Sequence, residues 1–140
     1  MRPAIVTLLF LLARPLVAHA DTEAQILEQC SGASQAGMRD CLEKRAIASQ
    51  HALRDTEKKT AEAIAAWDED KKFIGAAQAR LTAATQAFER YREAQCALSA
   101  SLGGGAVGNA LELRRLACVA AANDMQVEKL RRMTESLPRR

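Results

Sequence analysis

Apolar residues recur at helical spacing through most of the chain beyond residue 20. One series falls at intervals of three and four, which places its members on a single stripe of a helix: Ile74, Ala77, Leu81, Ala84, Phe88 and Tyr91. A later series has similar spacing: Leu113, Leu116, Ala120, Val127 and Leu130. No window shows the two-residue alternation of a strand. The pattern predicts an all-α protein.

Capping and helix-breaking residues set the expected bounds of the helices. Ser34 is placed to cap a helix, and Asn109 with Glu112 has the spacing of a reciprocal capping box. The charged run 68–72 favours a bend, with a continuous helix as the alternative, and the glycine-rich run 102–108 predicts a loop. We therefore expect a small antiparallel bundle of three to four helices with short connections, over residues 22–30, 34–67, 74–100 and from 109 onward.

The first 20 residues have the layout of a secretory leader. Arg2 supplies a positive start, residues 5–13 form an apolar run, and Ala18 and Ala20 are the small residues that a signal peptidase reads. An N-terminal membrane anchor is the alternative, but the run is shorter than the about 20 apolar residues that cross a bilayer. We expect a periplasmic or secreted protein with no membrane attachment after cleavage.

Cleavage after Ala20 would also change the charge balance. The chain has 20 basic and 17 acidic residues, and the leader holds two of the basic ones, Arg2 and Arg14, and no acid. The mature chain would then carry 18 basic against 17 acidic residues, a net charge of +1. A charge this small gives no reason to expect a nucleic-acid partner. The expected division is a signal peptide over 1–20, a single helical domain over 21–137 and a tail over 138–140.

Four cysteines follow the leader: Cys30, Cys41, Cys96 and Cys118. An even number in a short exported chain indicates disulfides, and four cysteines allow three pairings. Local geometry favours Cys30 with Cys41 and Cys96 with Cys118, because each pair would flank a predicted turn between helices. A metal site is disfavoured, since there is no CxxC and the two histidines do not cluster with the thiols. We expect no metal and no cofactor.

The segment 80–96, RLTAATQAFERYREAQC, resembles the central motif of the LprI-like lysozyme-inhibitor domain family. The matching positions are Phe88, Tyr91, Arg92, Glu93 and Cys96, and the family's other cysteines and its Gly-containing loop are matched at Cys30, Cys41, Cys118 and Gly103 to Gly105. The similarity spans about residues 30–130, with departures from the family pattern at Thr85, Phe88, Asn123 and Gln126. The resemblance implies an exported, non-enzymatic protein that binds and inhibits a peptidoglycan-cleaving lysozyme, of the c-type or another.

The motif residues have structural interpretations as well. Phe88 and Tyr91 lie on the apolar stripe and are expected in the core. Arg92 is expected to pair with an acidic side chain across the bundle, such as Glu112. His51 stands alone on a polar face and is expected to be solvated.

Two regions are candidate binding surfaces. Gly103, Gly104 and Gly105 form a loop between rigid helices, where recognition is often located, although a flexible connector is the alternative. Trp67, the only tryptophan, stands beside Asp68 and Asp70, so it is either half-buried at a helix end or an anchor for a basic partner.

Two other classes of function compete with inhibition. A structural or adaptor protein of the cell envelope would bind another exported protein through a helix face. An enzyme is disfavoured, because the sequence shows no nucleophile–base grouping, metal cluster or phosphate-binding loop.

Overall fold

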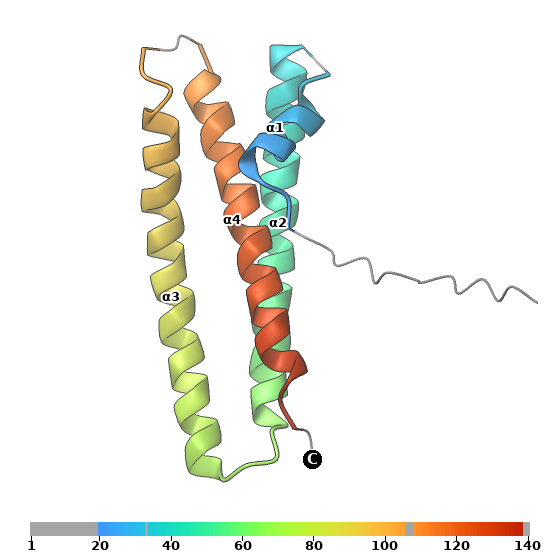
Figure 1. Cartoon of the computed structure of the whole chain (residues 1–140), viewed down its shortest axis with the longest axis vertical. Helices are drawn as coiled ribbons and strands as arrows, with labels where there is room; N and C mark the ends of the chain where they lie inside the picture. The colour runs from blue at the N-terminus through green and yellow to red at the C-terminus, as the bar shows by residue number, and fades with distance from the viewer. Residues whose placement is uncertain (1–19, 33, 106–107, 139–140) are drawn as a thin grey trace, which may run out of the picture.

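The computed structural model describes residues 20–32, 34–105 and 108–138, so the predicted leader lies outside the described residues apart from Ala20. The described chain forms four helices and no β-strand (Figure 1): α1 (Glu23–Cys30), α2 (Gln35–Ala65), α3 (Lys71–Ser101) and α4 (Ala110–Glu135). The predicted all-α fold is confirmed. The charged run at 68–72 is a bend, as expected, because α2 ends before it and α3 begins within it.

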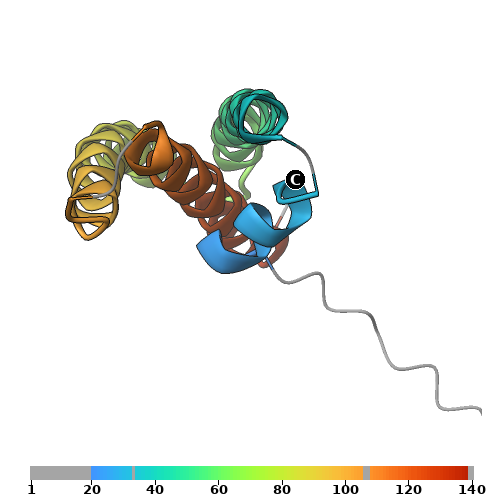
Figure 2. The same cartoon turned by 90° about the horizontal axis from the view of Figure 1, so that it is seen from above.

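The helix α4 is central to the bundle. It packs against each of the other three helices, and viewed from above it lies between α3 on one side and α1 and α2 on the other (Figure 2). Its buried side chains number ten, whereas Cys96 is the only fully buried residue of α3. Consecutive long helices run antiparallel, so α2 and α4, which pack against each other, run parallel (Figure 1). The helix α3 is held along one narrow stripe.

Side-chain caps start the first two helices. Thr22 Oγ1 accepts from the Gln25 backbone N–H while the Gln25 side chain accepts from the Thr22 backbone N–H. Ser34 Oγ accepts from the Gly37 N–H at 3.3 Å, which confirms the predicted cap. An oxygen in this position satisfies one of the free N–H groups of the first turn.

The predicted capping box at the start of α4 is wrong. The Asn109 side chain makes no cap hydrogen bond, since its backbone, at φ −95° and ψ 10°, is not in the extended conformation that directs a cap side chain toward the first turn. Glu112 instead pairs with Arg115 within the same helix, at 2.7 Å.

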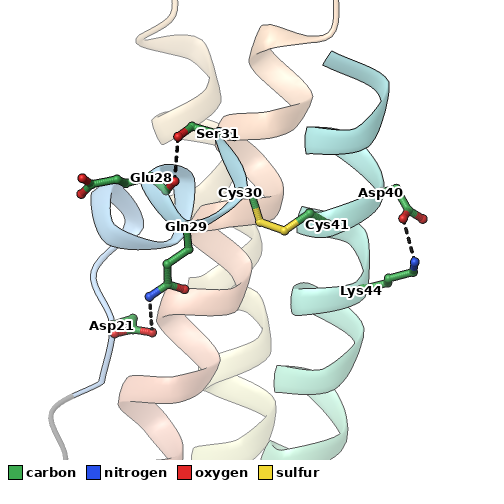
Figure 3. Close-up of a disulfide and its surroundings, with 8 residues drawn as sticks. All are labelled: Asp21, Glu28, Gln29, Cys30, Ser31, Asp40, Cys41 and Lys44. Carbon is green, nitrogen blue, oxygen red and sulfur yellow. Dashed lines mark hydrogen bonds and ion pairs between the residues drawn. A yellow bond between two sulfur atoms is a disulfide. The ribbon is translucent and has the colours of Figure 1, made fainter. Parts of the chain in front are cut away.

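Two disulfides join neighbouring helices in the pairing that local geometry favoured. Cys30–Cys41 links α1 to α2, with Cα atoms 5.7 Å apart (Figure 3), and Cys96–Cys118 links α3 to α4, with Cα atoms 5.5 Å apart. Both bridges lie toward the end of the bundle that holds α1 and the α3–α4 turn (Figure 1).

The core consists of two clusters at different levels of the bundle. The larger one lies in the stapled half, which we define as α1 with residues 34–48, 94–105 and 108–121; its buried members are Ile26, Cys30, Leu42, Ala46, Leu113, Leu116, Ala117, Ala120 and Ala121. The smaller one lies in the open half, residues 52–91 and 124–138, and contains Leu53, Val127 and Leu130, with Ala52, Leu81 and Phe88 packed against it.

The chain end returns to the α2–α3 turn. The carbonyl of Pro138 accepts a hydrogen bond from the Asp68 backbone N–H at 3.1 Å. Pro138 was expected to begin a frayed tail, but this bond ties it to the open half of the bundle. Arg139 and Arg140 lie outside the described residues.

Candidate functional site

The two candidate surfaces lie at opposite ends of the bundle. Trp67, Asp68 and Asp70 form the α2–α3 turn, and the three glycines form the α3–α4 turn (Figure 1). Between the two turns runs α3, whose 31 residues span about 45 Å at 1.5 Å per residue. The two regions therefore cannot contribute to one site, and each has to be considered by itself.

The glycine turn has a defined backbone. Gly103 donates to the Ala100 carbonyl and Gly104 to the Ser101 carbonyl, both at 3.0 Å. A Cβ at Gly103 would collide with the side chain of Leu111, and Gly104 has a φ of +59°, a conformation that a larger residue adopts only with strain. The backbone of the turn thus requires glycine at Gly104, whereas a larger residue at Gly103 would require the Leu111 side chain to move.

An apolar flank of α3 leads to this turn. Tyr91, Leu98 and Leu102 are 58%, 53% and 73% exposed, and their spacing of seven and four residues places them on one side of the helix. Tyr91 was expected in the core, and that prediction is wrong. Because α3 packs through a single stripe that includes Phe88, a residue three positions later lies at the edge of the stripe and faces solvent. Phe88 itself is half-buried against the smaller cluster.

Arg92 crosses the bundle, but not to the predicted acidic partner. Its Nη1 donates to Gln50 Oε1 on α2 at 2.6 Å and to Asn123 Oδ1 on α4 at 2.8 Å. Asn123, which is fully buried, donates in turn to Ser49 Oγ at 3.0 Å, and Ser49 donates to the Ala46 carbonyl at 2.8 Å. We call these four side chains the polar layer; they separate the two core clusters and connect all three long helices.

Sequence reasoning missed Ser49, Gln50 and Asn123. The signal for one of them was present, because Asn123 interrupts an apolar stripe of α4 at a position three or four residues from its neighbours Ala120 and Val127. A buried amide in such a stripe needs partners, and Arg92 is one of them. Arg92 donates to neutral amide oxygens, so the expectation of an acidic partner pointed to Glu112 instead of Asn123.

A cluster of charged side chains holds the segment that precedes α1 against the bundle. Arg45 on α2 pairs with Asp124 on α4 at 2.7 Å and with Asp21 at 3.2 Å. Asp21 also accepts from the Gln29 side chain at 3.1 Å (Figure 3). Burial raises the pKa of Asp124, an effect that Arg45 offsets in part.

The α2–α3 turn is built differently from the glycine turn. Trp67 is half-buried at the end of α2, as predicted, and it lines a hollow between the long helices. Asp70 precedes α3 without a side-chain cap, and its N–H donates to Glu69 Oε1 at 3.0 Å. The tryptophan therefore faces the interior of the open half, and the acidic residues lie on the turn beside it.

Three further features of the sequence concern function: potential metal ligands, His51 and segments that could span a membrane. Among the described residues, no three His, Cys, Asp or Glu side chains gather to form a metal site. His51 is exposed on α2, as predicted. None of the helices described is both long and apolar enough to cross a membrane.

These features define a class of protein: a small helical scaffold held by two disulfides, with an exposed turn at each end. The family model described as lysozyme inhibitor LprI matches residues 28–132, and the chain belongs to that family. The match includes all four cysteines, the polar layer and the glycine turn, and it confirms the resemblance drawn from residues 80–96. No curated protein and no solved structure matches the chain.

Proposed function

We propose that this protein is exported, loses residues 1–20, and acts without catalysis as an inhibitor that binds a peptidoglycan-cleaving lysozyme. The family match over residues 28–132 is the observation that carries the proposal. The two disulfides also support it, since such bridges persist in oxidising compartments such as the periplasm.

The surface that we assign to the lysozyme is the glycine turn with its neighbours. Leu102 beside the turn is 73% exposed, which makes it the most exposed large apolar side chain among the described residues. Arg114 lies next to Gly103 and makes no ion pair within the described ranges. A lysozyme cleaves with two carboxylates in a cleft, so a narrow turn that carries an apolar anchor and a guanidinium has groups that suit that cleft.

The stapled half would keep this surface in one conformation. Cys96–Cys118 bridges the two helices that enter and leave the turn, about one to two helical turns from its ends. Holding a binding loop in its bound shape reduces the entropy that association costs. The disulfide therefore has a direct use in the proposed inhibition, beyond stability.

Inhibition of cell-wall lysis tests the proposal. Oxidised protein of residues 21–140 is mixed with a c-type lysozyme, and the rate of clearing of a cell-wall suspension is followed as the protein is titrated. We expect loss of lysozyme activity at micromolar protein, weakened at least tenfold in Leu102→Asp and in Arg114→Glu. The matched control is Phe73→Asp, an exposed aromatic at the other end of α3, which should inhibit like the wild type. If the folded wild type does not affect lysozyme, the proposed target is wrong. If all variants inhibit equally, the proposed binding surface is wrong.

An adaptor function in the cell envelope is the second candidate. The exposed flank of Tyr91 and Leu98 favours it, because apolar side chains in a row on a helix are typical of surfaces that bind another protein. This function predicts a stable complex with an exported protein that Tyr91→Asp abolishes, together with unchanged lysozyme activity.

A further inference from the structure

The open half contains an apolar hollow that the proposed function does not use. It has a volume of about 370 Å³ and lies between α2, α3 and α4, at the end opposite the glycine turn. This volume is within the range of small-molecule sites. Most of its lining is aliphatic and comes from all three helices and the chain end: Ile64, Leu81, Leu130, Met133 and Leu137.

One buried polar group in the lining has no partner. Thr60 is 4% exposed, and its hydroxyl is the one buried side-chain nitrogen or oxygen without a hydrogen bond among the described residues. One helical turn earlier, Thr56 is equally buried and donates to the Ala52 carbonyl at 2.8 Å. A buried hydroxyl without a partner costs free energy. Because Thr60 lines the hollow, rotation of its side chain would let the hydroxyl bond to a polar atom of a ligand there.

A cation stands at the edge of the same hollow. Arg80 lines it from α3, is exposed, and makes no ion pair with the described part of the chain. The hollow thus offers three features to a ligand: an aliphatic wall, a threonine in its lining whose hydroxyl has no partner, and a guanidinium at its edge.

We propose that this hollow binds a hydroxylated single-chain fatty acid. The alkyl chain would lie against the aliphatic lining, the carboxylate would pair with Arg80, and a hydroxyl on the chain would hydrogen-bond to Thr60. A saturated chain suits walls formed mainly by Leu, Ile and Met, and one flexible molecule satisfies both polar groups at once. The site is separate from the glycine turn, so it does not depend on lysozyme inhibition.

Trp67 supplies the measurement. It is the only tryptophan of the chain and lines the hollow, so its fluorescence reports occupancy. Oxidised protein of residues 21–140 is titrated with 3-hydroxydecanoate, decanoate and decanol below their micelle concentrations. We expect saturable binding of both acids, with the hydroxylated acid about fivefold tighter, and decanol about tenfold weaker than decanoate. Absence of saturable binding, or equal affinity for all three, would overturn the proposal.

Four variants locate the ligand. Arg80→Gln should weaken both acids about tenfold and leave decanol unchanged, and Thr60→Val should remove the preference for the hydroxylated acid while decanoate still binds. Ala84→Phe should fill the hollow and abolish binding, whereas Ala83→Phe is the matched control, because both alanines are exposed on α3 and only Ala84 lines the hollow. Circular dichroism verifies that each variant is folded. Wild-type binding by Ala84→Phe, or an unchanged preference in Thr60→Val, would contradict the site.

Discussion

In the stapled half, nine buried residues from α1, α2 and α4 form one cluster, and two disulfides close the same end. In the open half, the corresponding cluster has three buried members, and a hollow of about 370 Å³ remains between the helices. Neither disulfide of the described chain has a cysteine in this half. The polar layer of Ser49, Gln50, Arg92 and Asn123 lies between the two.

The bundle is packed more tightly at one end than at the other. The short α1 supplies Ile26 and Cys30 to the stapled half, and α4 contributes small residues there that allow close packing. Nothing comparable covers the open half, where α3 contacts its neighbours by a single stripe. We expect the rigid end to present a fixed surface and the looser end to have room for a ligand.

The largest contrast should appear on truncation of the two clusters. Leu42→Ala, in the stapled half, should lower the free energy of unfolding by about 4 kcal/mol, since Leu42 is fully buried in the larger cluster. Leu130→Ala, in the open half, should cost about 2 kcal/mol, because Leu130 already faces the hollow and loses fewer contacts. Denaturant unfolding of the oxidised proteins measures both. Equal costs would show that the halves are packed alike.

Removal of either disulfide should have the next largest effect. Replacing both cysteines of a bridge by serine is expected to cost about 3 kcal/mol, and somewhat more for Cys96–Cys118, which spans 22 residues, than for Cys30–Cys41, which spans 11. Thermal unfolding of the two double variants provides the comparison. If removal of Cys30–Cys41 lowers stability more than removal of Cys96–Cys118, the stabilisation does not come from loop closure.

Disruption of the polar layer tests whether it couples the halves. Asn123→Ala should cost about 2 kcal/mol, because Arg92 and Ser49 each lose a buried partner. Asn109→Ala is the control on the same helix, since Asn109 makes no cap hydrogen bond, and it should change stability by less than about 0.5 kcal/mol. Hydrogen exchange should show that the Asn123 variant loses protection at both ends, and loss confined to one end would argue against coupling.

A threonine pair within the open half should give effects of opposite sign. Thr60→Val removes a hydroxyl without a partner and should raise the free energy of unfolding by about 1 kcal/mol. Thr56→Val removes a hydroxyl bonded to the Ala52 carbonyl and should lower it by about 1 kcal/mol. Equilibrium unfolding in urea measures the difference, and destabilisation by both changes would mean that Thr60 has a partner.

The smallest effects concern pH, and they differ between the halves. Burial raises the pKa of Glu57, in the open half, above its ordinary value of 4.5, so its contribution to stability is full below pH 4.5 and is lost as the pH rises through the raised pKa. The hydrogen bond from Arg115 lowers the pKa of Glu112, in the stapled half, so its contribution is present above pH 4.5 and is lost as the pH falls through the lowered pKa. As the pH rises from about 3 to about 7, Glu57→Gln should gain stability relative to the wild type and Glu112→Gln should lose it, with the Glu112 effect mostly below pH 4.5 and the Glu57 effect above it. Unfolding curves across this range measure how the stability difference between each variant and the wild type changes with pH. Changes of the same sign for the two variants would contradict the opposite pKa shifts of Glu57 and Glu112.

Local sequence patterns predict much of the fold. The spacing of Ile74, Leu81 and Phe88 predicts the inner stripe of α3, and Ser34 marks the start of α2, because a helix face and a helix cap are determined by residues within a turn or two of one another. The disulfide pairing also followed from local geometry, since each bridge joins helices on either side of one turn. The motif at residues 80–96 was enough to indicate the family that the match over residues 28–132 confirms.

The candidate sites depended on contacts that no local pattern contains. Whether Tyr91 is buried or exposed depends on how wide a stripe of α3 its neighbours cover. The residues that accept hydrogen bonds from Arg92 lie on α2 and α4, 42 and 31 residues away in sequence. The hollow beside Thr60 likewise arises because three helices and the chain end fail to fill the space between them. The amino-acid sequence by itself determined the helices, the Ser34 cap of α2 and the bridges, because those interactions act within a helix or across a single turn. Only the tertiary structure decided which polar residues meet and where space remains, because both depend on how helices distant in sequence pack together.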